Sequence, residues 1–173
     1  MGNDAKRLLI GPDRQSLGRG SKDHLRRHRN AINGNNDVDA VVVVILTRAN
    51  AEIGQFDDAR RCIGEAMAAV ETAKERWCEA EVNRIGGEIA LLSPEPDLAK
   101  AEAYFERALT IARTQQAKSW ELRAAMSMAR LWRDQGKPQQ ARDLLAPVYG
   151  WFTEGFDTLD LRQAKVLLEE LAS

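Results

Sequence analysis

Apolar residues recur at helical spacing along most of the chain after residue 40. In the segment 59–70 they stand at i, i+3, i+4, i+7 and i+11, which is one face of an amphipathic helix. The segments 98–112 and 141–148 repeat this spacing. Good helix formers (Ala, Leu, Glu, Arg and Gln) dominate this part of the chain. The pattern therefore predicts an all-α domain over residues 39–173.

Turn-forming residues separate the predicted helices. Gly54 can end a first helix, and the segment SPEPD at 93–97 breaks the chain, with Asp97 as the expected N-cap of the next helix. Gly136 and Pro138 follow the usual order of a glycine after one helix and a proline at the start of the next. These breaks predict helical hairpins joined by short turns.

The second helices of the predicted hairpins share a small–large–small pattern. Three segments, which begin at positions 54, 96 and 136, each have an alanine at their sixth position. A larger apolar residue follows four positions later, and an alanine or valine follows three positions after that. The first helices correspond at Trp77 and Trp120, which we expect to pack between hairpins. A period of 40 to 42 residues with two helices per unit is typical of stacked hairpins. The expected packing positions are Ala59, Ile63, Ala66, Gly87, Ala101, Phe105, Ala108, Ala129, Ala141 and Leu145.

Aromatic residues gather near the end of the last predicted hairpin: Tyr149, Trp151, Phe152 and Phe156. Pro147 lacks a backbone N–H, so the helix that contains it should kink or restart there. A capping helix is predicted from about 158 to 171, with Asp157 or Thr158 as its N-cap. Its apolar face consists of Leu161, Ala164, Leu168 and Leu171. We interpret the aromatic residues mainly as the contact that docks this helix, with a ligand-binding patch as the alternative.

These positions resemble tetratricopeptide repeats, in which a small residue late in the first helix (here Thr47, Gly87 and Ala129) precedes the turn and the small–large–small second helix. A more specific resemblance covers about residues 45–172. The segments KERWCEAEVNRIGGEIALL and KSWELRAAMSMARLWRDQGKPQQARDLLAPVYGWFTEGFDTLDLRQAKVLLEELA look like the C-terminal repeat region of large bacterial proteins. In those proteins a class III adenylate/guanylate cyclase domain, or a DNA-binding domain, precedes an AAA/STAND-type ATPase. The resemblance implies a tetratricopeptide-like stack of about three helical hairpins plus a C-terminal capping helix.

The catalytic parts of that family have no counterpart in this sequence. A class III cyclase needs two metal-binding aspartates on an α/β sheet, and the ATPase needs a phosphate-binding loop after a strand. The segment GPDRQSLGRGSKD at 11–23 has neither Gly-Lys-Ser/Thr nor a preceding buried strand. Although family membership alone would suggest an adenylate cyclase, we expect no enzyme activity and no cofactor. The expected function is a non-catalytic protein–protein interaction or regulatory module in signal transduction.

Charge is distributed unevenly along the chain. Residues 1–30 carry eight Lys/Arg and three Asp, a net charge of +5, and the whole chain has −1, which leaves −6 for the rest. Residues 1–38 are rich in glycine and asparagine and poor in large apolar residues, which predicts a disordered basic tail. An alternative function follows: an accessory subunit in nucleotide signalling or transcription whose tail contacts nucleic acid. We favour a protein partner over nucleic acid.

The apolar run VVVVIL at 41–46 is too short to span a bilayer, and the two cysteines suit a reducing compartment, so we expect a cytoplasmic protein. This run is more apolar than the solvent-facing end of a repeat stack should be. Either the tail covers it or it pairs with a second copy of the chain. A homodimer through this N-terminal helix is therefore expected as one of two arrangements.

Titratable residues form no reaction centre in the sequence. His24 and His28 are four residues apart, but a zinc site needs three or four ligands, and Cys62 and Cys78 lie far away in the chain. We expect a solvated basic tail, buried or unreactive thiols, and solvated helix carboxylates at 79–88. No metal site and no catalytic residue is predicted.

The first helices of stacked hairpins line the concave side of the stack, and their positions outside the packing face a partner. Arginines from neighbouring first helices would form a basic strip there, and guanidinium groups match carboxylates well. We expect an acidic segment or a C-terminal tail of a partner to bind, against the alternative of an ordinary helix surface with weak ion pairs. The candidate groove residues are Arg48, Glu52, Arg84, Glu88, Arg123, Met126, Arg130 and Arg133.

Overall fold

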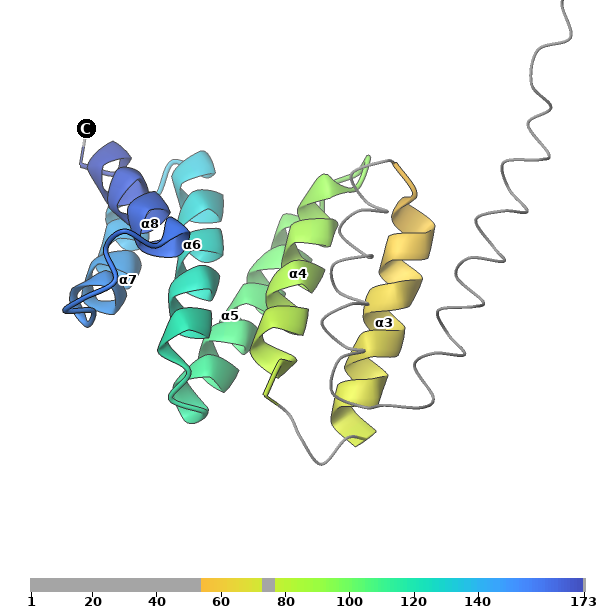
Figure 1. The fold of residues 1–173 in the computed structure, drawn as a ribbon. Helices are drawn as coiled ribbons and strands as arrows, with labels where there is room; N and C mark the ends of the chain where they lie inside the picture. Colours follow the sequence, from red (N-terminus) through yellow and green to blue (C-terminus); the bar gives the residue numbers. More distant parts are fainter. Residues whose placement is uncertain (1–53, 73–76, 173) are drawn as a thin grey trace, which may run out of the picture. The chain divides into compact units, whose positions relative to one another are not determined.

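The computed structural model describes residues 54–72 and 77–172. The predicted tail at 1–38, the first predicted helix and the candidate residues Arg48 and Glu52 therefore lie outside the described residues. The described residues contain six α-helices and no strand (Figure 1). The helices are α3 (Phe56–Thr72), α4 (Glu79–Leu92), α5 (Leu98–Thr114), α6 (Lys118–Asp134), α7 (Pro138–Gly150) and α8 (Leu159–Glu170).

Consecutive helices pack as hairpins that follow one another in a row (Figure 1). Helix α4 pairs with α5, and α6 pairs with α7. Contacts of α3 with α4 and of α5 with α6 join neighbouring units, and α8 lies against both α6 and α7. Alternate helices also meet, because α6 contacts both α4 and α8. The all-α stack of helical hairpins with a last capping helix is thus confirmed.

Small residues bring the paired helices close together, and larger ones fill the neighbouring space. All of the expected packing positions are buried, from Ala59 to Leu145. The ring of Phe105 is fully buried and lies directly over Gly87 of α4, where a Cβ atom would come within 2.4 Å of the ring. Two apolar clusters result, one between α3 and α4 and one that runs from α5 to α8.

The turns form as their residue types predict. Asp97 caps α5, and its carboxylate accepts a hydrogen bond of 2.9 Å from the backbone N–H of Lys100. Gly136 follows α6 with a φ of 75°, in the left-handed region that glycine adopts without strain. Pro138 is the first residue of α7, where its missing N–H costs no helical hydrogen bond.

Two expectations at the C-terminal end need correction: α7 does not restart at Pro147, and Leu168 is less buried than its neighbour Leu167. Helix α7 continues through Pro147 to Gly150, because the proline removes a single backbone donor close to the end of the helix. On α8 the buried apolar residue is Leu167, whereas Leu168 is only partly buried. Both residues fit a helical spacing from Ala164, and the packing against α6 and α7 selects one of them. Thr158 precedes α8 but makes no side-chain cap hydrogen bond.

The aromatic residues divide into a packed pair and an exposed pair. Tyr149 and Phe152 pack against the core, whereas Trp151 and Phe156 are 58% and 46% exposed. Trp77 is also 44% exposed, contrary to the expectation that it packs between hairpins. The seal between α7 and α8 is therefore made by only part of the aromatic group.

No helix in the described part of the chain has the length and apolar character needed to cross a membrane.

Candidate functional site

A charged network lies along α4, on the side that this helix shares with α6. Arg84 is buried and donates two hydrogen bonds of 2.7 Å to the two carboxylate oxygens of Glu81, and a third to Glu88. Their spacing of three and four residues puts all three side chains on one face of the helix. Burial acts to lower the pKa of Arg84, but the hydrogen bonds and charges of the two glutamates outweigh it and raise the pKa above its usual value. The guanidinium is therefore a fixed positive charge.

The network continues across α6 to α8. Arg123 of α6 donates a 2.7 Å hydrogen bond to Asp160 of α8, and another of its nitrogens lies 3.9 Å from Glu81 of α4. The guanidinium of Arg123 also lies 5.0 Å from the ring centre of Trp120. These contacts connect the three alternate helices α4, α6 and α8. We name the side of the stack on which these ionic residues lie the α4–α6–α8 face.

Arg130 differs from the other arginines of α6. Arg133 donates a 2.6 Å hydrogen bond to Glu170 of α8, whereas Arg130 makes no hydrogen bond or ion pair within the described residues. Burial lowers the pKa of Arg130, the positive charges of Arg133 and Arg84 lower it further, and Glu88 and Glu170 oppose them. Arg130 is thus a half-buried cation without a direct counter-ion.

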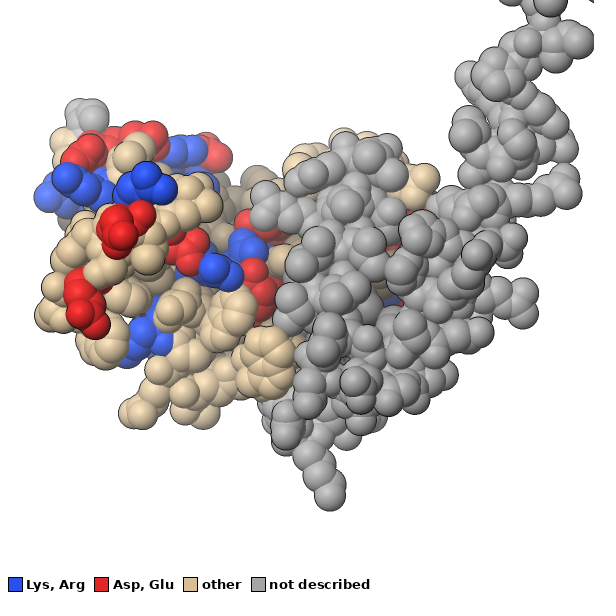
Figure 2. All heavy atoms as spheres, in the orientation of Figure 1, with Lys and Arg blue, Asp and Glu red and all other residues tan. Residues whose placement is uncertain are grey.

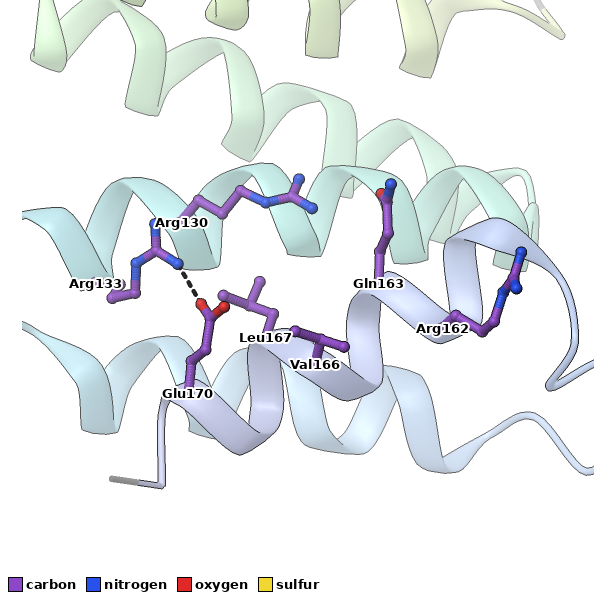
Figure 3. Close-up of a pocket in the computed structure, with 7 residues that line it drawn as sticks. All are labelled: Arg130, Arg133, Arg162, Gln163, Val166, Leu167 and Glu170. Carbon is purple, nitrogen blue, oxygen red and sulfur yellow. Dashed lines mark hydrogen bonds and ion pairs between the residues drawn. The ribbon is translucent and has the colours of Figure 1, made fainter.

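An open pocket of about 470 Å³ lies at Arg130, between α6 and α8 (Figure 3). Figure 3 shows the pair of Arg133 and Glu170 at one end of the labelled group and Arg162 at the other, with Arg130 and Gln163 between them. The lining residues are Arg130, Arg133, Arg162, Gln163, Val166, Leu167 and Glu170. A pocket of this size can hold a few side chains of a bound segment.

Two of the predicted groove residues do not lie on an open surface. Arg84 and Met126 are only 8% and 3% exposed. Arg84 is covered because it is packed among its own ion-pair partners. Met126 is covered because α6 contacts helices on several sides and its buried face is correspondingly wide.

The predicted basic strip is in fact balanced by acidic residues. Glu81 and Glu88 lie beside Arg84, and α8 supplies Asp160 and Glu170 opposite the arginines of α6. Where Figure 2 shows described residues, basic and acidic side chains are interspersed, without a wide area of one sign. Pairing within α4 was visible in the spacing of its residues. The partners on α8 were not, because they stand 37 positions away from Arg123 and Arg133.

The sequence reasoning missed the contribution of α8. Gln163, Val166 and Arg162 line the pocket, but the helix was assigned only a capping role. Helix α8 contacts α6, as α6 contacts α4. The row of alternate helices therefore consists of α4, α6 and α8. The available signal was the first two turns of this helix, where Arg162, Gln163 and Val166 stand outside the predicted apolar face.

Catalytic and metal chemistry has little support in the described residues. They contain no group of three or more His, Cys, Asp or Glu side chains that could hold a metal ion. Glu121 is buried, which acts to raise its pKa, but the hydrogen bonds from Lys118 (2.8 Å) and Arg113 (2.9 Å) outweigh burial and lower it. A carboxylate held ionised in this way is a structural ion-pair partner rather than a proton donor.

Comparison of the chain with protein-family models, with curated proteins and with solved structures gives no match.

Proposed function

We propose that this chain is a non-catalytic protein-interaction module that receives a segment of a partner protein on the α4–α6–α8 face. The observation that carries the proposal is the half-buried Arg130, which has no direct counter-ion within the described residues and opens into a pocket. The other arginines that the face buries or half-buries, such as Arg84 and Arg123, already have acidic partners. Within the described residues, Arg130 is therefore a positively charged position on this face that a ligand can neutralise.

The resemblance to the C-terminal repeat region of cyclase-linked ATPases supports a regulatory role for this interaction. In this proposal the repeats receive or relay a protein signal, and chemistry belongs to other proteins. Turnover of ATP or GTP above background by the purified chain would overturn the non-catalytic part of the proposal. Contact of the N-terminal tail with nucleic acid and a homodimer through the first predicted helix stay predictions, because those segments lie outside the described residues.

The interaction can be tested by selecting short random peptides with blocked termini on the purified full chain. We expect enriched peptides to bind the wild-type chain and to bind weakly to Gln163→Trp, because the large side chain fills the pocket. Gln140→Trp is a matched control, because Gln140 is exposed on α7, away from the lining residues. Both variants change exposed glutamines and should keep the helical circular dichroism spectrum of the wild type.

Two results would contradict the proposed function. In the first, selection enriches no peptide above the background of a chain-free surface. In the second, the enriched peptides bind Gln163→Trp and Gln140→Trp equally well, which would place binding outside the pocket region of the face.

A further inference from the structure

The charges in the pocket leave two cations without an ion-pair partner among the described residues. The lining contains three arginines and one glutamate, and the Arg133–Glu170 pair neutralises one arginine. Arg130 and Arg162 remain, and neither makes a hydrogen bond or ion pair within the described residues. They come from two different helices, and Figure 3 shows their guanidinium groups well separated along the pocket.

Both positions are unfavourable for a cation in the free protein. Arg162 lies at the end of the first turn of α8, where the helix dipole favours negative charge. Arg130 is half-buried and lies near the positive charge of Arg133. A bound anion would offset both costs.

Apolar surface lines the same pocket as the two cations. Val166 is 53% exposed and lines the pocket beside the buried Leu167. Gln163 adds an amide that can both donate and accept hydrogen bonds, which suits a peptide backbone. The pocket is open, so an extended segment can lie across it.

We infer that this pocket binds an acidic segment inside a partner protein, with one carboxylate on Arg130, a second on Arg162, and an aliphatic side chain on Val166 in the same pocket. This inference rests on the proposed function and adds the chemistry of the ligand. Each guanidinium can hold a carboxylate through two parallel hydrogen bonds. Two separated cations in a pocket that also exposes apolar surface fit a segment that combines acidic and aliphatic residues.

A nucleic acid would bring phosphates to the same arginines, but the surrounding face disfavours it. Glu81, Glu88 and Asp160 lie along the α4–α6–α8 face and are not among the residues that line the pocket. A continuous polyanion would meet these carboxylates, whereas a short acidic segment need contact only the pocket. The intermixed charges in Figure 2 therefore favour a peptide.

The test uses the enriched peptides from the selection, with acetylated and amidated ends so that no terminal carboxylate is present. We expect them to place Asp or Glu next to aliphatic residues and to lose affinity when the acids are changed to Asn and Gln. Arg130→Gln and Arg162→Gln in the full chain should each weaken binding by about 10- to 100-fold in fluorescence anisotropy, because each removes a charge-assisted hydrogen-bonding group. Binding should also weaken as salt is added.

Arg142→Gln is the matched control, because Arg142 is an exposed arginine of α7 outside the pocket. It should change the affinity by less than about threefold. All three variants should unfold at the same temperature as the wild type within a few degrees, so a loss of binding would not reflect a loss of fold.

The outcomes separate this inference from the proposed function. Enriched peptides that are neutral or basic, or that ignore Arg130→Gln and Arg162→Gln, would overturn the inference and leave the interaction module standing. An absence of enriched peptides would overturn both. Tight binding of a single-stranded oligonucleotide that is lost in Arg130→Gln, together with peptides that show no acid preference, would replace the acidic segment with a phosphate ligand.

Discussion

Replacement of Gly87 by alanine tests whether close approach of α4 and α5 determines the packing of the stack. A Cβ atom at this position would lie 2.4, 2.7 and 2.9 Å from the Cε1, Cδ1 and Cζ atoms of Phe105. The ring is fully buried in the apolar cluster, where its neighbours resist any movement. The two helices must therefore move apart, or the ring must leave its favoured rotamer.

The free-energy change has two opposing parts. Overpacking of a buried site costs about 1–3 kcal/mol, and three ring atoms closer than 3.0 Å place this site near the upper end of that range. Alanine is favoured over glycine inside a helix by about 1 kcal/mol. We expect a net loss of about 2 kcal/mol in the free energy of unfolding. For a domain of this size that loss lowers the melting temperature by about 4–8 °C.

The assay is urea unfolding followed by circular dichroism, with Gly64→Ala as the matched control. Gly64 lies inside α3, and a Cβ atom there would meet no atom within 4 Å. The control should therefore gain about 0.5–1 kcal/mol from helix propensity alone. A Gly87→Ala protein as stable as the control would refute the argument that the ring requires glycine.

A second variant identifies the clash itself. Phe105→Leu removes ring atoms next to Gly87 and should destabilise the wild type through the cavity that it leaves. The same change should destabilise Gly87→Ala much less, because the smaller side chain makes room for the new methyl group. Additive effects of the two substitutions would show that the contact between them is not the cause.

The remaining predictions concern stability away from the pocket. Pro147→Ala restores one helical donor in α7 and should raise the free energy of unfolding by about 1–3 kcal/mol; an unchanged urea midpoint would contradict this. Arg84→Leu leaves the carboxylates of Glu81 and Glu88 without their shared cation and should lower the free energy of unfolding by about 3–5 kcal/mol. The loss should be smaller when Arg84→Leu is introduced into a Glu81→Gln protein. Equal losses with and without Glu81→Gln would count against the network. The pKa of Glu121 is lowered in the folded chain, so its contribution to stability is full above its usual value of 4.5 and is lost as the pH falls through the folded pKa. Unfolding measured over a pH series should therefore show a smaller acid-side loss in Glu121→Gln, and identical profiles would contradict the assignment.

Local features of the fold were predictable because they depend on residues close in sequence. The cap at Asp97, the left-handed Gly136 and the start of α7 at Pro138 each follow from one residue type in a short context. Where local rules left a choice, the prediction was less exact. Leu167 and Leu168 both fit the periodicity of α8, and only contact with its neighbours decided between them.

The repeat pattern by itself determined the all-α class, the hairpin pairing and the close approach at Gly87 and Phe105, because each depends on spacing along the chain. The tertiary structure alone decided which charges meet. It set Asp160 against Arg123 and Glu170 against Arg133 across 37 positions, and left Arg130 without such a partner within the described residues. Ion pairs between helices depend on distances of a few ångströms across the packed stack. The periodicity of one helix carries no information about the charges on an alternate helix of the stack.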